Sequence, residues 1–357
     1  MPTIEELRQF QSLPLDIKIR LTEDRINEYV RVFGIDNVCI SFSGGKDSTV
    51  VLDIARKTYP NIKAVYCDTG LEYPEIKQFV KSFSNVEIIR PKMVFADVIK
   101  EYGYPIISKE ISEAIYAVRN NTTCKGTIDK MYGNCRNNTQ ERMKKLNREG
   151  EYSGNSRYNY SKYLPLLDVD FKIGNRCCSI MKKQPLKSYS KKTGNKPIVC
   201  TMADESLLRT HIWLKDGCTI WEGKNTSCKP ISFWTNQDIL QYIKENNLPI
   251  ASVYGEIVET IDGNAEQMCI EGCGNKLKCT GCQRTGCMYC GYGAHLEKQG
   301  EKRFVKLKQT HPKIYDFVMN GGGYNEQGLW QPTKEGLGFK YVLDTLNKIY
   351  GKDFIEY

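Results

Sequence analysis

The sequence predicts an α/β protein with a doubly wound, mostly parallel sheet, helices on both faces, and a cysteine-rich, metal-binding C-terminal region. Three observations lead to this prediction. Apolar stretches typical of buried strands alternate with helical patterns. A glycine turn joins one such strand directly to a helix. Near the end of the chain, six cysteines lie within 22 residues.

The composition indicates a cytoplasmic protein with no membrane partner. The chain has 357 residues and 40% hydrophobic content, enough for one large elaborated domain or for two domains. It has no apolar run of about 18 residues, and its start, MPTIEELRQF, lacks the pattern of a secretory signal. In a reducing compartment, the 15 cysteines favour metal binding over disulfides. The formal charge of +9 suits anionic partners such as nucleotides or nucleic acid.

We expect three regions along the chain. Residues 1–37 form an N-terminal helical segment, whose amphipathic helix 16–33 is ended by Gly34. Residues 38–260 form the nucleotide-binding α/β domain, and residues 261–357 the cysteine-rich and helical C-terminal region.

The stretch 38–55, VCISFSGGKDSTVVLDIA, reads as a strand, a glycine turn and a helix, which together make an anion site. Gly44 and Gly45 permit positive φ and close approach of a ligand. Lys46 adds a positive charge, and Asp47 is suited to hold a Mg²⁺ ion that bridges phosphates. The spacing is not that of the Walker motif. The predicted nucleotide-binding residues are Ser43, Gly44, Gly45, Lys46, Asp47, Ser48 and Thr49, of which Ser48 and Thr49 are also candidates to cap the helix.

Two further polar groups follow predicted strands. In parallel sheets ligands bind beyond the carboxyl ends of the strands, so we expect Asp68, Thr69 and Gly70 to contact the nucleotide or a metal; the alternative is a simple strand-ending turn. Arg209 is a candidate clamp for phosphate or sulfate; the alternative is a surface ion pair with Glu205. The strands before these two groups are predicted at residues 62–67 and 196–202, and a further strand is predicted at 86–89.

A basic insertion covers residues 120–163, where the periodicity fades. Between residues 120 and 148 there are seven Lys or Arg and two acidic residues, with a short helix predicted at 141–146. The segment would suit a nucleic-acid contact, with tyrosines available to stack on bases. A solvated loop is the slightly stronger interpretation.

The cysteine spacing indicates metal ligands. CTGCQRTGCMYC contains two C-x2-C pairs, which is typical of metal sites. One candidate is a tetrathiolate zinc site; in the second, Cys287 and Cys290 join the adjacent cysteines 177 and 178. Thiolates bind zinc and iron–sulfur clusters alike, so the spacing does not choose between them. The zinc candidates are Cys269, Cys273, Cys279 and Cys282.

Taken together, the motifs resemble a known family. SGGKDS is similar to the pyrophosphate (PP) loop of the ATP-pyrophosphatase superfamily, whose members cleave ATP between the α and β phosphates. The ordered motifs SGGKDS, DTG, CCSIMKKQPL, ADESLLR, FWTNQDILQYI and GCMYC resemble the phosphoadenosine and adenosine phosphosulfate reductase family over roughly residues 38–293. In character the chain is closest to the sulfur-inserting ATPases of DNA phosphorothioation.

The resemblance implies an adenine nucleotide alpha hydrolase-like fold and a [4Fe-4S] cluster. The implied cluster ligands are Cys177, Cys178, Cys287 and Cys290, with Cys218 as a substitute. Two departures from the reductases favour ATP-dependent activation. No cysteine follows Cys290 in this chain to attack a sulfate sulfur, and Lys46 occupies a loop position where such reductases usually lack lysine.

The function predicted from these features is adenylation of an acceptor by ATP-Mg, followed by iron–sulfur-dependent sulfur transfer. Lys46, Asp47 and Arg209 are the expected catalytic residues. The acceptor could be nucleic acid or a small molecule, the sulfur donor a partner such as a cysteine desulfurase, and the protein a homodimer. One alternative is a phosphosulfate reductase that uses an internal thiol, Cys124 or Cys135. Another is a non-catalytic nucleic-acid-binding subunit containing zinc and nucleotide.

Overall fold

The computed structural model describes residues 2–122, 131, 160–260, 276–298, 300 and 302–357. Within these residues, no helix is both long enough and apolar enough to cross a membrane. The elements up to residue 119 are α1 (Ile4–Gln11), α2 (Leu15–Phe33), β1 (Val38–Ser41), α3 (Lys46–Thr58), β2 (Lys63–Cys67), α4 (Pro74–Lys81), β3 (Val86–Ile89), α5 (Phe95–Tyr102), β4 (Ile106–Ile107) and α6 (Lys109–Arg119). Those that follow are α9 (Gln184–Thr193), β5 (Lys196–Val199), α10 (Leu207–Asp216), β6 (Thr219–Ile220), β7 (Ser227–Cys228), α11 (Asn236–Glu245), β8 (Ile257–Thr260), β9 (Lys276–Cys279), β10 (Gly291–Tyr292), α12 (Arg303–Thr310), α13 (Pro312–Met319), β11 (Gly323–Tyr324), β12 (Trp330–Gln331) and α14 (Phe339–Tyr350).

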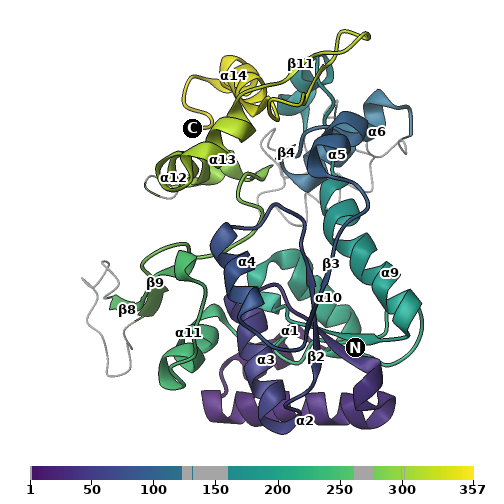
Figure 1. The fold of residues 1–357 in the computed structure, drawn as a ribbon, viewed down its shortest axis with the longest axis vertical. Coiled ribbons are helices and arrows are strands. Elements are labelled where there is room, and N and C mark those ends of the chain that lie inside the picture. The colour runs from purple at the N-terminus through teal and green to yellow at the C-terminus, as the bar shows by residue number, and fades with distance from the viewer. Residues whose placement is uncertain (1, 123–130, 132–159, 261–275, 299, 301) are drawn as a thin grey trace, which may run out of the picture. The chain divides into compact units, whose positions relative to one another are not determined.

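A six-stranded sheet has the order β3-β2-β1-β5-β7-β6. Its strands β2 and β3 are labelled in Figure 1. All neighbouring strands are parallel except the edge strand β6, which is antiparallel to β7. The chain moves outward from β1 to β3 and later returns to β5 on the other side of β1. Because parallel crossovers are right-handed, this reversal places helices on both faces of the sheet. The predicted doubly wound, mostly parallel α/β fold is confirmed.

The central strand and the first long helix have a direct sequence explanation. In β1, Val38, Cys39 and Ile40 are all buried, as expected for a parallel strand covered on both faces. The amphipathic helix predicted at 16–33 is α2, and it ends at Gly34, whose φ is +81°. Polar Lys18 also lies on the buried face of α2, which the apolar pattern did not indicate.

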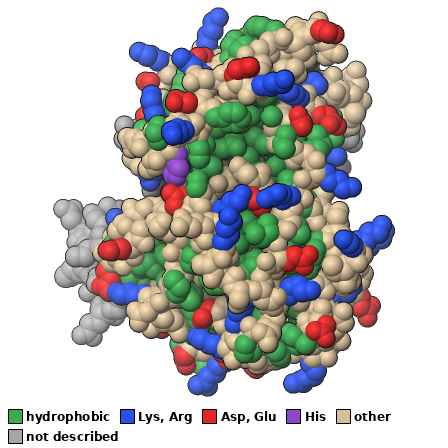
Figure 2. All heavy atoms as spheres, viewed as in Figure 1, with side chains coloured by type: hydrophobic (Ala, Val, Ile, Leu, Met, Phe, Trp, Pro, Cys, Tyr) green, Lys and Arg blue, Asp and Glu red, His purple; other side chains and the backbone are tan. Residues whose placement is uncertain are grey.

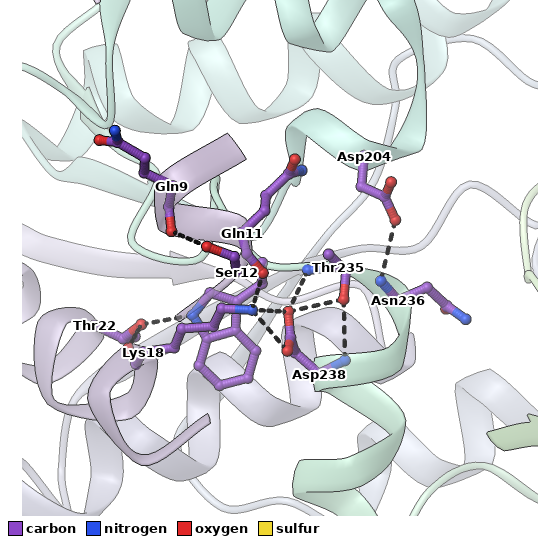
Figure 3. A network of polar contacts seen from close by, with 10 residues as sticks. Gln9, Gln11, Ser12, Lys18, Thr22, Asp204, Thr235, Asn236 and Asp238 are labelled. Carbon is purple, nitrogen blue, oxygen red and sulfur yellow. Dashed lines mark hydrogen bonds and ion pairs between the residues drawn. The ribbon is translucent and has the colours of Figure 1, made fainter. Parts of the chain in front are cut away.

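A buried polar network connects α2 to the start of α11 (Figure 3). The Lys18 ammonium lies 2.7 and 2.8 Å from the two carboxylate oxygens of Asp238, and it donates to the Gln11 carbonyl at 2.7 Å. Asp238 also accepts from the backbone N–H of Thr235, which is the N-cap of α11. Because every charge in this network has a partner, the network can be buried, and it fixes where α11 begins.

The chain forms two compact units, each made of two segments. Unit 1 comprises Met1–Pro91 and Lys182–Gly286, and unit 2 comprises Lys92–Met181 and Cys287–Tyr357. This division differs from the three consecutive regions expected from the sequence. The reason is that strands from both halves of the chain pair within each unit: β5 joins β1 in unit 1, and β10 joins β4 in unit 2.

Unit 2 has short strands around an aromatic core. Tyr104 contacts Phe171 and Phe339 edge to face, with ring centroids 5.8 and 5.2 Å apart. The Tyr104 hydroxyl donates to the Leu337 carbonyl at 2.7 Å. These contacts hold the segment before β4 against the helical C-terminal part of the chain.

Most of the basic insertion, including the helix predicted at 141–146, lies outside the described residues. On the face shown in Figure 2, Lys and Arg side chains are interspersed with Asp and Glu. Because most of the insertion lies outside the described residues, both interpretations of it, the nucleic-acid contact and the solvated loop, stay predictions.

Candidate functional site

A cavity of about 540 Å³ lies in unit 1, where β1, β2 and β5 end. This is the point at which the strand order reverses and where open α/β sheets bind ligands. Its volume falls within the usual range for small-molecule sites. The wall is built mainly from Ser41, Phe42, Ser43, Gly45, Lys46, Asp47 and residues 65–67, 199–202 and 283–286.

The glycine loop is held tightly at the start of α3. Gly44 has a φ of +72°, and a Cβ there would lie 2.9 Å from a methyl group of Ile76 in α4. Gly45, rather than a serine or threonine, is the N-cap of α3. The Ser48 and Thr49 hydroxyls instead donate to the Gly45 carbonyl, each at 2.9 Å. These two hydroxyls therefore hold the backbone of the loop by local side-chain-to-backbone hydrogen bonds.

Lys46 is buried at the cavity wall. Its ammonium donates to the Gln283 carbonyl at 3.0 Å and to Asn236 Oδ1 at 3.3 Å, and it lies 5.4 Å from the ring centroid of Tyr254. The Lys46 backbone N–H donates to the Tyr254 hydroxyl at 3.3 Å. The lysine is therefore positioned by residues far away in sequence, and its charge lies beside the loop that is expected to bind phosphate.

Asp47 follows Lys46 and faces the same cavity. Its pKa is raised to about 6, first by burial and then by the charge of Glu205, while the charges of Lys46, Arg284 and Arg209 act in the opposite direction. A carboxylate that burial makes costly to ionise is one that a bound cation would stabilise.

Two arginines converge on one carboxylate in the cavity. Glu205 Oε2 lies 3.1 Å from Arg284 Nη2 and 3.3 Å from Arg209 Nε. The ion pair between Arg209 and Glu205, the alternative to a phosphate clamp, is present. Arg209 nevertheless lines the cavity, so the two roles are compatible.

The Asp68–Gly70 triplet lies at the end of β2. The Asp68 carboxylate is 2.7 Å from Lys77 and 3.6 Å from Arg90. Burial opposes its ionisation, but the hydrogen bond and charge of Lys77 hold its pKa below the usual range. The flanking residues Cys67 and Glu72 line the cavity. A contact between the triplet and a nucleotide stays a prediction.

Several cavity residues were not selected from the sequence. Tyr254, Asn236 and the segment 283–286 come from loops or helix starts whose patterns carry no chemical signature of their own. Two signals were available in retrospect. Asn236 follows the capping residue of α11, and Arg284 lies between two cysteine pairs.

The four cysteines implied by the family resemblance all belong to unit 2, where short strands hold their segments. Segment 172–174 flanks Tyr104 just before β4, with the Tyr104 N–H donating to the Lys172 carbonyl at 2.8 Å, while β10 pairs with β4. The Tyr292 hydroxyl of β10 then donates to the Gly174 carbonyl at 3.0 Å. A Cβ on Gly291 would collide with the Pro105 carbonyl oxygen, so only glycine allows this close pairing. The segments leading to and from the two cysteine pairs thus lie side by side.

The thiols of this group influence each other. A hydrogen bond with Cys178 raises the pKa of Cys177 well above its usual range, and burial and the charges of Cys178, Cys290 and Cys287 act in the same direction. Burial raises the pKa of Cys290, while the Tyr292 N–H and Arg303 oppose the rise. Four mutually repelling thiolates would be stabilised by a bound cation, so this donor set fits an iron–sulfur cluster.

A site for a single metal ion needs several ligands that converge on one point. Within the described parts of the chain, no three His, Cys, Asp or Glu side chains are arranged to hold one metal ion. A four-iron cluster does not need such convergence, because each thiolate binds a different iron.

Of the four zinc candidates, Cys269 and Cys273 lie outside the described residues. Burial raises the pKa of Cys279, and the charge and hydrogen bond of nearby Lys46 oppose that rise. Cys279 thus lies beside the loop lysine in unit 1. The candidate substitute ligand, Cys218, also belongs to unit 1, where its charge acts on Cys228.

Comparison with known proteins assigns the family. The model of the phosphoadenosine phosphosulfate reductase domain matches residues 37–110 and 116–292, which is more than half of the chain. The chain belongs to the phosphoadenosine phosphosulfate reductase family. Members of this family are enzymes, and the match includes the nucleotide-binding loop of pyrophosphate type and all four implied cluster cysteines.

Individual relatives are distant. The uncharacterized protein MJ0973 of Methanocaldococcus jannaschii is 22% identical over 299 residues, or 82% of this chain. The chain spans about half the length of that protein. A crystal structure of phosphoadenylyl-sulfate reductase from Candida auris, in a phosphate complex, aligns with 71% of this chain and 91% of its own, at 13% identity and a TM-score of 0.35.

Proposed function

We propose that this member of the phosphosulfate reductase family binds ATP-Mg in the unit 1 cavity and cleaves it between the α and β phosphates. The cleavage adenylates an acceptor, which then receives sulfur. The observation that carries the proposal is the placement of Lys46. Its buried ammonium lies at the cavity wall beside the glycine loop, and three further cations, Lys182, Arg209 and Arg284, line the same cavity. That number of cations suits a triphosphate.

In the proposed first step, an acceptor oxygen attacks the α phosphorus. A new P–O bond forms, the bond to the bridging oxygen breaks, and pyrophosphate leaves with the electron pair. Lys46 and the start of α3 would stabilise the negative charge that develops on pyrophosphate. Asp47 would hold the Mg²⁺ ion that accompanies the nucleotide. The protein contributes chiefly by positioning and electrostatics.

In the second step, a sulfur nucleophile at the oxidation level of sulfide replaces the activated oxygen, and AMP leaves with that oxygen. The donor would be a partner such as a cysteine desulfurase, whose persulfide sulfur is brought to the sulfide level by a thiol reductant that supplies two electrons and becomes a disulfide. The acceptor would be either nucleic acid or a small molecule. Cys177, Cys178, Cys287 and Cys290 would hold a [4Fe-4S] cluster, which would supply redox-active iron near the delivered sulfur. Along the chain, Cys287 directly follows Gly286 of the cavity wall.

The test uses water as the default acceptor. Purified protein under anaerobic conditions is incubated with ATP-Mg labelled at the α phosphate, and the products are separated. We expect AMP and pyrophosphate, and we expect Lys46→Ala to lower their rate of formation by about 100-fold or more, the loss typical for removal of one charge-stabilising group. Arg31→Ala, an exposed arginine of α2, serves as the matched control. Formation of ADP and phosphate, or full activity of Lys46→Ala, would contradict the proposal.

The family itself supports a second candidate, a phosphosulfate reductase that forms sulfite. Calorimetric titration separates the two candidates. Tight binding of ATP-Mg with little affinity for adenosine or phosphoadenosine phosphosulfate supports the ATP-consuming enzyme. The reverse preference, together with thiol-dependent sulfite formation, supports the reductase.

A further inference from the structure

We propose that Arg284, held together with Arg209 by Glu205, binds the β and γ phosphates and makes the cavity selective for triphosphates. The inference rests on the proposed function and adds to it the part of the nucleotide that this segment would recognise. Arg284 lies between β9 and Cys287, in a stretch selected only for its cysteines.

Glu205 is itself firmly held. Its Oε1 accepts from the Met202 backbone N–H at 2.9 Å, while Oε2 faces both guanidinium groups. Its side chain is only 13% exposed, whereas those of Arg209 and Arg284 are 39% and 68% exposed. The carboxylate is thus a fixed support, and the two guanidinium groups that it holds line the cavity and are more exposed than it is.

The stability of the fold does not explain why two arginines share Glu205. An ion pair as exposed as that between Arg284 and Glu205 contributes about 0–1 kcal/mol to folding. A guanidinium group has five N–H donors in a planar fork. One or two donors on Glu205 leave the others available for phosphate oxygens, which match the same fork.

Arg284 is held close to the glycine loop, the part of the cavity that is expected to bind phosphate. The hydroxyl of its neighbour Thr285 is 2.5 Å from the Tyr254 hydroxyl, which also accepts the N–H of Lys46. The charge of Arg284 acts on Asp47 in the glycine loop. Arg284 thus lies close to the loop that is proposed to bind phosphate, where the paired arginines would share the β and γ phosphates with Lys46.

The experiment is calorimetric titration of the full chain with ATP-Mg and, separately, with AMP. Arg284→Ala should weaken ATP-Mg binding about 10- to 100-fold, as expected for one charged hydrogen-bonding group, and weaken AMP binding less than about threefold. Arg284→Lys, which keeps the charge but not the fork, should recover only part of the loss. Arg31→Ala should bind both nucleotides like the wild type. Because the Arg284 side chain is mostly exposed, we expect these variants to fold, and circular dichroism checks this.

The outcomes separate the inference from the proposed function. Wild-type protein that does not bind ATP-Mg would overturn both. Wild-type binding with an unchanged ATP affinity in Arg284→Ala would overturn the inference alone. So would an equal loss for ATP and AMP, because Arg284 would then act on the shared part of the two nucleotides.

Discussion

The cavity of unit 1 and the cysteine group of unit 2 solve the problem of buried charge in opposite ways. In unit 1, the charged groups are balanced by the protein: Glu205 faces two arginines, and the Lys46 ammonium has two oxygen acceptors. In unit 2, a hydrogen bond with Cys178, burial, and the charges of Cys178, Cys290 and Cys287 all raise the pKa of Cys177. The comparison teaches that the protein itself supplies partners for most charges of the first site, with Asp47 as the exception, whereas the thiols of the second would be stabilised chiefly by a bound cation.

The largest effect should follow from removing one thiol of the cysteine group. If Cys178 is an iron ligand, Cys178→Ser should reduce the iron and acid-labile sulfide content from about four per chain to near background. The measurement is metal and sulfide analysis of anaerobically purified protein.

Cys218→Ser is the matched control, since Cys218 belongs to unit 1. It should keep the iron, and both variants should still bind ATP-Mg, because the cavity residues come from unit 1. Wild-type protein containing zinc without sulfide would show that the cluster assignment is wrong.

A second prediction concerns the buried pair that positions α11 in unit 1. Lys18→Met should lower the free energy of unfolding by about 3–5 kcal/mol, because it leaves the Asp238 carboxylate buried without its partner. Urea unfolding followed by tryptophan fluorescence measures this. Trp213, Trp221 and Trp234 lie in unit 1, so the signal reports mainly on that unit.

The comparison variant is Lys244→Met, in which the broken pair with Glu259 is about half exposed. Its expected cost is about 0–1 kcal/mol. Equal costs for Lys18→Met and Lys244→Met would contradict the view that α11 depends on a buried charge pair.

The smallest predicted effect is a gain in stability. The pKa of Asp47 is raised to about 6, so between pH 4 and 6 the folded state binds more protons than the unfolded state. Stability contributed by this group is therefore lost as the pH rises through that window, and the full cost is present above it. Asp47→Asn should raise the free energy of unfolding at pH 8, without magnesium, by on the order of 2 kcal/mol.

Thermal or urea unfolding at several pH values checks this. The variant and the wild type should have the same stability at pH 4 and diverge as the pH increases. A variant that is less stable than the wild type at pH 8 would show that the surroundings of Asp47 favour its charged form.

Much of the fold could be read from local patterns. Strand-like runs at 38–42, 62–67, 86–89 and 196–202 became four neighbouring parallel strands, β1, β2, β3 and β5. The inner strands β1 and β2 are mostly buried, as expected for strands covered on both faces, whereas the edge strand β3 is partly exposed. The glycine loop could also be recognised from the sequence, because its chemistry is contained within seven consecutive residues. Ser48 and Thr49 show the limit, since the side chains expected to cap α3 bond instead to the Gly45 carbonyl.

The sequence by itself determined the doubly wound fold, the family, the loop beginning at Ser43 and the four candidate cluster cysteines, because each of these depends on residues close together in the chain or on ordered motifs. Only the tertiary structure decided what surrounds them. Asn236, Tyr254 and Gln283 reach Lys46 from about 190 to 240 positions away, and β10 reaches β4 across a similar distance. Such contacts depend on how the elements pack and leave no periodic signal in the sequence.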